Sequence, residues 1–345
     1  MRIPKLILSF MLILAFSACS PAPESRTIDG HIFGTFYQVT IGAQHADADI
    51  DSLHAGVEEV LQEVDRQMST YRADSVLNRL NQAELNQAVA VDSELFFVLQ
   101  RSEAIASQSG GAFDHTVGGL VSLWGFGPEG TVTTRPDQDE LQRRLEQVGY
   151  HFVILDAQAQ TAMRTSDVFV DLSGIAKGYG VDVVSAYLSE QGIDNHLVNI
   201  GGDLYAKGTR TSEDLWRVGI EAPNDQRQVI QQILPVTNTA MVSSGDYRNY
   251  FEYEGVRYSH TIDPTTGTPI AHHLASTTVL ADNATDADGY ASAIMVLGPE
   301  RGLQFANQHA IAAFLIVRQE GGYVSFESDA FRRDFANEMT VPRVR

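Results

Sequence analysis

The stretch "DLSGIAKGYGVD", residues 171–182, joins an acidic residue to a turn of small residues and then to a helix predicted over roughly 175–191. Asp171 ends the apolar run before the turn. Gly174 would let the backbone come close to a ligand, and Lys177 would lie in the first helical turn. A lysine there opposes the helix dipole, and an anionic ligand would offset that cost. The stretch therefore predicts a strand, a turn and a helix around a binding site for an anion.

This turn is not a known phosphate loop. A Walker loop reads GxxxxGK[ST], and the segment from Gly174 to Gly178 lacks both the spacing and the hydroxyl. The glycine pattern GxGxxG is also absent from this segment. From these residues alone a second interpretation stays open, in which Lys177 is simply solvated and Asp171 caps the helix.

Hydrophobic periodicity extends the prediction in both directions along the chain. Predicted helices cover 50–68, a segment capped at Asp92-Ser93 and stopped by Gly110-Gly111, 137–148, 285–297 and 300–308. Predicted strands cover 27–41, 151–155, 167–171, 196–200, 216–222, 231–236, 239–245, 312–317 and 322–326, with a hairpin over 247–262 that turns at Glu254-Gly255. Because helices and strands mix without a regular βαβ alternation, we expect an α+β fold, as one compact, bilobed domain.

The N-terminus differs from the rest of the chain. A basic start and an apolar run of about a dozen residues are typical of a signal peptide, and the run is too short to span a membrane. We therefore expect residues 1–18 to be a lipoprotein signal peptide, Cys19 to be lipidated, 19–26 to form a tether, and 27–345 to form the domain. The alternative is an ordinary signal peptide with an incidental cysteine.

The charge of the chain limits its partners. The 345 residues carry a formal net charge of −20, and loss of residues 1–18, which hold two cations and no acid, would change it to −22. Such a surface repels nucleic acid and anionic lipid headgroups, so we expect no nucleic-acid partner. An anionic ligand would need local help from a metal, a lysine or backbone amides. With a single cysteine, no internal disulfide can form.

Two further stretches carry residues suited to catalysis and metal binding. In "SHTIDPTTGTP" (259–269), His260 precedes a strong turn and is the best candidate general base, although a lone histidine is more often structural. In "DADGYASAIMVLG" (286–298), Asp288 and Ser292 would share one helix face. These oxygen donors suit magnesium rather than zinc, and the alternative is that an aspartate merely caps the helix. Neighbouring His272 and His273 could bind metal, but nothing nearby has ligand spacing.

A glycine-rich aromatic stretch could hold a flat ligand. "GGAFDHTVGGLVSLWGFG" (110–127) interleaves Phe113, Trp124 and Phe126 with glycines, and Tyr71 in "MSTYR" is free to stack. The stretch could equally line a core.

Taken in order, these stretches resemble the ApbE family of magnesium-dependent FAD:protein FMN transferases, over nearly the whole chain from about residue 27 to beyond 320. The motifs that carry the resemblance are "GTFY", "MSTYRADS", "GGAFDHTVGGLVSLWGFGP", "DLSGIAKGYGVD", "NIGGDLYAKG", "SSGDYRNYF", "SHTIDPTTGTP" and "DADGYASAIMVLG".

The resemblance implies a T-fold-like α+β domain that holds FAD in a cleft between its lobes. It implies transfer of FMN from FAD onto a threonine hydroxyl of a target protein, with release of AMP. Family targets are membrane-bound respiratory subunits, as in sodium-translocating NADH:quinone reductase and Rnf complexes. Their flavin sites face the periplasm, where a protein anchored to the inner or outer membrane through Cys19 would also lie.

The resemblance also assigns roles residue by residue. Ligand contacts are implied at Phe33, Tyr71, Ala112, Phe113, Asp114, Asp171, Lys177 and Ile262. The metal would be held by the Gly174 carbonyl, Asp288 and Ser292, and the catalytic residues would be His260, Asp288 and Lys177. Phe33 replaces the methionine of many members, and because both are apolar its stacking should survive. Ser292 replaces the usual threonine and loses the methyl that stiffens the rotamer, so we expect a functional but looser metal site. Two other functions remain open for the same site: hydrolysis of FAD to FMN and AMP, and FAD binding without catalysis.

Overall fold

The computed structural model describes residues 24–130, 132, 134–223, 229–247 and 249–339. The predicted signal peptide and Cys19 lie outside the described residues. The first strand begins at Arg26, one residue before the predicted start of the domain, and the guanidinium of Arg26 donates a hydrogen bond to the carbonyl of Ala48. Within the described residues, no helix combines the length and the apolar character needed to cross a bilayer.

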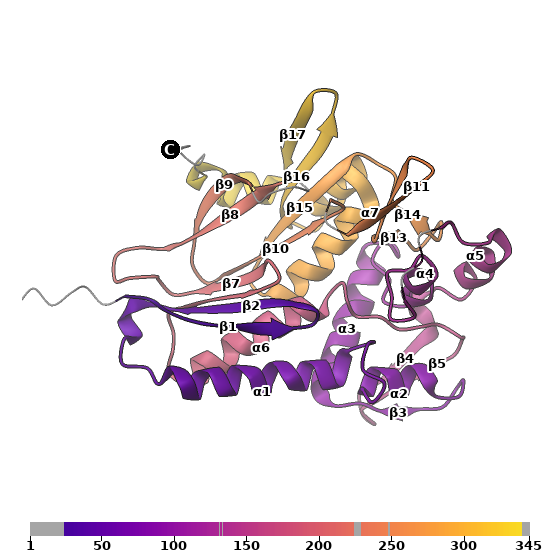
Figure 1. The fold of residues 1–345 in the computed structure, drawn as a ribbon, viewed down its shortest axis with the longest axis horizontal. Helices are drawn as coiled ribbons and strands as arrows, with labels where there is room; N and C mark the ends of the chain where they lie inside the picture. Colours follow the sequence, from indigo (N-terminus) through magenta and orange to yellow (C-terminus); the bar gives the residue numbers. More distant parts are fainter. Residues whose placement is uncertain (1–23, 131, 133, 224–228, 248, 340–345) are drawn as a thin grey trace, which may run out of the picture.

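An antiparallel eight-stranded sheet forms the centre of the fold (Figure 1). Its strands, in spatial order, are β1 (Arg26–Ile32), β2 (Thr35–Ile41), β6 (His196–Ile200), β7 (Asp203–Lys207), β10 (Thr239–Gly245), β15 (Leu274–Ala281), β16 (Ala312–Gln319) and β17 (Gly322–Glu327). The inner strands β15 and β16 are buried almost throughout, because other elements cover both faces of the sheet.

Three long helices cover one face of this sheet: α1 (Ile50–Met68), α6 (Ala176–Glu190) and α7 (Ala284–Gln308). The other face carries the paired strands β8 (Trp216–Ala222) and β9 (Val229–Val236) and the helix α8 (Asp329–Asp334). There, Trp216, Leu234, Phe314 and Phe331 form a second apolar core.

A smaller lobe gathers at one end of the sheet (Figure 1). It holds α2 (Val76–Gln82), α3 (Ser93–Gln108), α4 (Gly118–Leu123) and α5 (Gln138–Leu145), the small sheet β3 (Val89–Ala90), β5 (Thr161–Arg164) and β4 (Val153–Asp156), and the hairpins β11 (Tyr250–Tyr253) with β12 (Val256–Ser259) and β13 (Ile262–Asp263) with β14 (Thr268–Pro269). Short 3₁₀ turns lie at Ala43–His45, Tyr150–Phe152 and Ala336–Glu338. The expected α+β class with two lobes is confirmed.

The single strand predicted over 27–41 is wrong, since this segment is the hairpin β1–β2. The chain turns at Phe33 and Gly34, whose φ angles are 52° and 73°, and Ile32 pairs with Thr35. Asparagine or glycine usually occupies such a turn, so a phenylalanine there gives no turn signal. A left-handed non-glycine residue costs about 1 kcal/mol or more, which suggests that the position of the Phe33 ring matters.

The strand predicted over 167–171 is also wrong. This segment joins no ladder and makes a single isolated bridge, between Val117 and Phe169. Side chains take over the hydrogen bonds of a ladder: the amide of Asn81 bonds both backbone groups of Val170, and the guanidinium of Arg164 donates to the carbonyl of Val168. Asn81, 89 residues earlier in the chain, and the nearby Arg164 thus satisfy part of the backbone where a partner strand was expected.

Other differences concern α7 and β15. The two helices predicted over 285–297 and 300–308 are consecutive parts of α7, which is interrupted at Gly298 with φ 78° and continues from Pro299.

The elements β15, α2, α4 and α8 of the structure were not predicted at all. The run "LASTTVLA" of β15 mixes hydroxyl and apolar residues and is buried on both faces, so it lacks the polar–apolar alternation of an exposed strand.

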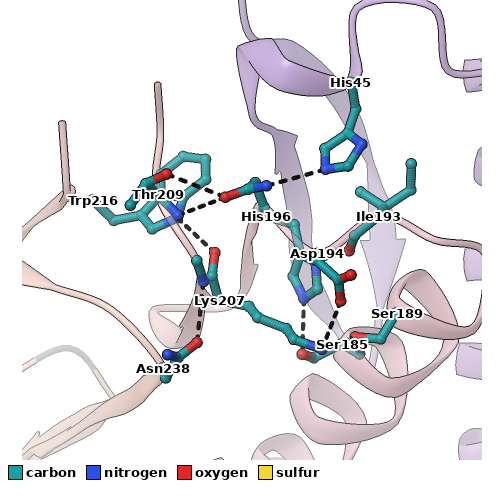
Figure 2. A network of polar contacts seen from close by, with 12 residues as sticks. His45, Ser185, Ser189, Ile193, Asp194, His196, Lys207, Thr209, Trp216 and Asn238 are labelled. Carbon is teal, nitrogen blue, oxygen red and sulfur yellow. Dashed lines mark hydrogen bonds and ion pairs between the residues drawn. The ribbon is translucent and has the colours of Figure 1, made fainter. Parts of the chain in front are cut away.

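A buried polar network ties α6 to β6 and β7 (Figure 2). His196 is fully buried and its Nδ1 lies 2.7 Å from the carbonyl of Ile193, which can only accept, so Nδ1 carries the proton and Nε2 accepts from Ser185 at 2.8 Å. The ammonium of Lys207 reaches Ser189 at 2.6 Å and Asp194 at 3.1 Å. Burial lowers the pKa of His196 to about 4.

This network predicts sensitivity to acid. The folded state disfavours protonation of His196, whereas the unfolded chain accepts this proton near pH 6.5. The contribution of His196 to the free energy of unfolding is therefore complete above that pH and is lost as the pH falls towards 4. His196 should account for about 2 kcal/mol of lost unfolding free energy between pH 7.5 and pH 5. Urea unfolding of wild type and His196→Gln at both pH values measures this. The variant should be less stable at pH 7.5 but lose less on acidification, and an equal loss in both proteins would contradict the prediction.

Candidate active site

Two adjoining cavities form a cleft between the helical face of the sheet and the smaller lobe. One, of about 410 Å³, is named here the Asp288 cavity, and the other, of about 860 Å³, the Tyr71 cavity. Val121, Ser173, Lys177 and His260 line both of them. A ligand could therefore extend from one cavity into the other.

The structure brings every predicted site residue among those it describes to this cleft. Around the Asp288 cavity lie Ala112, Phe113, Asp114, Gly174, Lys177, His260, Ile262, Asp288 and Ser292. Around the Tyr71 cavity lie Phe33, Tyr71, Asp171, Lys177 and His260. Only Cys19 of the predicted set is outside the described residues.

The three predicted metal donors lie together where the starts of α6 and α7 meet. The hydroxyl of Ser292 donates to the carbonyl of Gly174 at 3.2 Å, and Asp288 lies one turn earlier on α7. The Oδ2 atom of Asp288 accepts from the amide of Gly178 at 3.0 Å. A Cβ on Gly178 would come within 2.2 Å of the carbonyl of Ala284, so only glycine allows α6 and α7 to approach this closely.

Helix α7 is capped by Asn283, whose side chain accepts from the amide of Asp286, so Asp288 is not the cap. Likewise Asp171 does not cap α6, which begins at Ala176. Its Oδ1 atom accepts from the amide of Ser173 in the preceding turn, and burial raises its pKa. Both carboxylates therefore face the cleft for reasons other than starting a helix.

Lys177 is not a free solvated cation. Its ammonium forms an ion pair with Asp203 and lies 3.7 Å from Oδ2 of Asp288. Burial alone would lower the pKa of Lys177, but the two carboxylates raise it above its ordinary value, so the ammonium stays charged. In the sequence, Asp203 was singled out only as part of the motif "NIGGDLYAKG". The feature that could have identified Asp203 is its position, as an acid directly after two glycines at the start of a strand.

These groups fit a hard divalent cation. The available donors are a carboxylate, a hydroxyl and a backbone carbonyl, all oxygen, which is the set that magnesium accepts. Two buried acids, Asp203 and Asp288, face a single ammonium, so the group would not attract a pyrophosphate without added positive charge. Among the residues described, no three His, Cys, Asp or Glu side chains cluster as a metal site, and His272 is bound to the carbonyl of Met295.

His260 is held with one ring nitrogen available. It directly follows β12, and both its backbone amide and its Nδ1 lie 3.1 Å from the carbonyl of Asn249. That carbonyl can only accept, so the proton is on Nδ1 and Nε2 is unprotonated. Burial lowers the pKa of His260, and the ring is neutral at pH 7. His260 can therefore accept a proton from a hydroxyl that enters the cleft.

An aromatic stack fixes the hairpin that carries His260. The ring of buried Trp124 stacks on Tyr258 at 5.3 Å, Tyr258 on Phe251 at 5.2 Å, and Phe251 on Phe126 at 5.7 Å. The edge of Phe126 meets the His260 ring at 6.3 Å. The glycine-rich aromatic stretch thus serves both predicted purposes: Trp124 is core, while Phe113 and Phe126 line the cleft.

The remaining predicted ligand contacts are of two kinds. Some side chains are open to a ligand, and one is already hydrogen-bonded within the protein. Tyr71 is 70% exposed and its hydroxyl donates to the carbonyl of Phe126 at 3.2 Å, so its ring can cover a ligand. The Phe33 ring packs against Gly180 and forms another wall of the Tyr71 cavity. The carboxylate of Asp114 is buried and accepts from the amide and hydroxyl of Thr116 and the amide of Tyr150, which makes its side chain a structural support.

Comparisons with known proteins agree with this geometry. The family model for the ApbE family matches residues 33–315. The FAD:protein FMN transferase of Vibrio cholerae is 40% identical over 320 residues, covering 93% of this chain and 96% of the relative. That of Haemophilus influenzae is 37% identical over 333 residues, covering 95% and 96%.

Solved structures show the same likeness. The flavin transferase ApbE from Vibrio cholerae superposes with a TM-score of 0.83 at 40% identity, covering 90% of this chain and 99% of that chain. The apo form of the Pseudomonas stutzeri flavinyl transferase ApbE gives a TM-score of 0.82 at 35% identity, covering 90% and 97%. The chain therefore belongs to the ApbE family.

Proposed function

We propose that this protein transfers FMN from FAD to a threonine hydroxyl of an acceptor protein, using Mg²⁺ and releasing AMP. The observation that carries the proposal is the shared cleft, in which an unprotonated nitrogen of His260 and the oxygen donors of Gly174, Asp288 and Ser292 face the same space. The transferase names of the relatives support the reaction, and the donor set supports the metal.

The two cavities suit two neighbouring parts of the FAD substrate. The Tyr71 cavity offers Phe33 and exposed Tyr71 as aromatic walls for the isoalloxazine ring. The Asp288 cavity, with Lys177 between both cavities, would receive the pyrophosphate. Magnesium bound to Gly174, Asp288 and Ser292 would neutralise charge on the phosphate oxygens.

The protein's own residues then order and deprotonate the reactants. The threonine oxygen forms a bond to the phosphorus of the FMN half, and the bond from that phosphorus to the bridging oxygen breaks. The bridging oxygen and its electron pair leave with AMP. The hydroxyl proton passes to Nε2 of His260, since a neutral threonine is a poor nucleophile. Lys177, kept charged by its carboxylates, lies beside the phosphates.

Two other functions use the same cleft. With water in place of threonine, the reaction would give FMN and AMP by hydrolysis. A storage protein would bind FAD without chemistry, but it would need neither a base held like His260 nor a set of metal donors beside it. These features favour catalysis over storage.

The partners and the location are inferred from the sequence and the resemblance. We infer acceptors among membrane-bound electron-transfer subunits, such as those of sodium-translocating NADH:quinone reductase or Rnf complexes. Lipidation of Cys19 would anchor the enzyme to the inner or outer membrane, facing the periplasm, where such acceptors present their flavin sites. Labelling with a radioactive fatty acid, lost in Cys19→Ser, tests the anchor.

The transferase proposal is tested with the chain from Ser20, FAD, magnesium and a threonine-containing acceptor domain. After a denaturing gel, we expect fluorescence of the acceptor band that disappears with a chelator. Magnesium-dependent FMN and AMP without a labelled band would favour hydrolysis instead. Bound FAD with neither product would leave a carrier.

The aromatic stack gives a further prediction. Phe251→Leu removes the central ring between Tyr258 and Phe126, so the hairpin that holds His260 should shift. A misplacement of about 1 Å can cost about 100-fold in rate, and we expect a fall in kcat of about 10- to 100-fold. FAD affinity, measured by flavin fluorescence, should change little. The control is Val256→Ala at the exposed hairpin turn, and equal rates in both variants would contradict the role of the stack.

A further inference from the structure

Lys177 lies between two buried carboxylates but directly contacts only one of them. Its ammonium is in direct contact with Asp203, whereas 3.7 Å separates it from Oδ2 of Asp288, beyond an ordinary hydrogen bond. The side chains of Asp203 and Asp288 are each 3% exposed, so water does little to weaken either attraction. The lysine is therefore held by one of two available acids.

The backbone holds Asp203 and Asp288 in place, whereas the long side chain of Lys177 is the flexible partner. Asp203 opens β7 directly after Gly201 and Gly202, whose φ angles are 61° and 106°, and its carboxylate position follows from that tight turn. The amide of Gly202 donates to the side chain of Asn199 at 2.9 Å, which stabilises the turn. Asp288 is held from the other side by the amide of Gly178.

A lysine ammonium and a divalent cation compete for the same carboxylate. If Lys177 had no other partner, it would need to move only about an ångström to bond Asp288 directly, and it would then have to be displaced before a metal could bind. We infer that Asp203 is a positioning residue that holds the Lys177 ammonium away from Asp288 and so keeps this carboxylate available to the metal. The inference rests on the magnesium site proposed above.

The competing explanation is that Asp203 acts only through its charge, or as a direct ligand. In that case its loss would weaken metal binding whether or not Lys177 is present. If Asp203 acts by holding Lys177, its loss matters only while the lysine is there. A double-mutant cycle between the two residues separates these explanations.

The experiment measures Mn²⁺ affinity by electron paramagnetic resonance, without FAD, in wild type, Asp203→Asn, Lys177→Met and the double variant. We expect Asp203→Asn to weaken Mn²⁺ binding by about 10-fold in the presence of Lys177 and by less than about 2-fold in the Lys177→Met background. An equal loss in both backgrounds, or no loss in either, would overturn the inference.

Two controls keep the outcomes distinct. Thermal melts show whether each variant is folded, and Asp203→Ser provides a second uncharged replacement if Asp203→Asn is not. Asp288→Asn must abolish specific Mn²⁺ binding. If wild type and Asp288→Asn bind alike, the metal site itself is refuted and the inference falls with it. A specific site with no coupling between Asp203 and Lys177 refutes the inference alone.

Discussion

Asp288→Asn is expected to reduce FMN transfer by about 1,000-fold or more, because a metal that neutralises phosphate charge contributes several kcal/mol to the barrier. Asparagine keeps the size of the side chain and can still accept the hydrogen bond from the amide of Gly178. The substitution therefore removes the charge that would hold the cation while leaving the contact between α6 and α7. Lys177 would then face Asp203 alone, as a neutral pair.

The measurement is the initial rate of acceptor labelling over a range of magnesium concentrations, together with FAD affinity with and without the metal. We expect the rate of the variant to stay low at every magnesium concentration and the magnesium-dependent part of FAD binding to disappear. Asp286→Asn is the matched control. It makes the same change two residues earlier on α7, where the carboxylate pairs with Arg101, and it should retain most of the transfer activity.

A labelling rate in Asp288→Asn within about 10-fold of wild type would contradict the metal site, since loss of one charged ligand to a catalytic cation costs more than that. Unchanged FAD binding with no turnover in either protein would support storage rather than catalysis.

His260→Gln is expected to lower the transfer rate by about 100- to 10,000-fold, the usual contribution of a general base. Glutamine can still donate a hydrogen bond to the carbonyl of Asn249, so the end of the hairpin should keep its place. FAD affinity should stay within about 3-fold of wild type, because the loss concerns proton transfer rather than binding.

The pH profile distinguishes a base from a binding residue. Burial lowers the pKa of His260, so the unprotonated form dominates at pH 7, and the wild-type rate should fall only as the pH drops through that lowered value. His260→Gln should lose this acid limb. His273→Gln, an exposed histidine thirteen residues later, is the control and should keep the profile. Retention of the acid limb in His260→Gln would assign the base to another group of the cleft.

The sequence predicted those elements whose pattern is local. The apolar spacing over 50–68 is that of α1, and the pairing of Asp288 with Ser292 needs only one turn of helix. The hairpin turn at Glu254-Gly255 follows from the freedom of a glycine at positive φ. The site residues themselves came from the motifs, and the structure gathered them in one cleft.

What the sequence missed depends on contacts across long stretches of chain. The turn at Phe33 is unfavourable by itself and is stable only because its ring packs on Gly180 of α6. Residues 167–171 stay out of a sheet because Asn81 and Arg164 supply their hydrogen bonds. No local pattern reveals that Asn81, 89 residues before Val170, is one of these partners.

The sequence by itself thus determined the longer helices, the family and the list of chemical groups, since these follow from spacing along the chain. Tertiary structure alone decided which groups meet. It placed Asp203 on Lys177 and the Gly174 carbonyl beside Ser292, and it gave His260 its available nitrogen through Asn249. The physical reason is that electrostatic and hydrogen-bonding energies depend on distance in space and on burial, and both are set only when the sheet, α6 and α7 pack together.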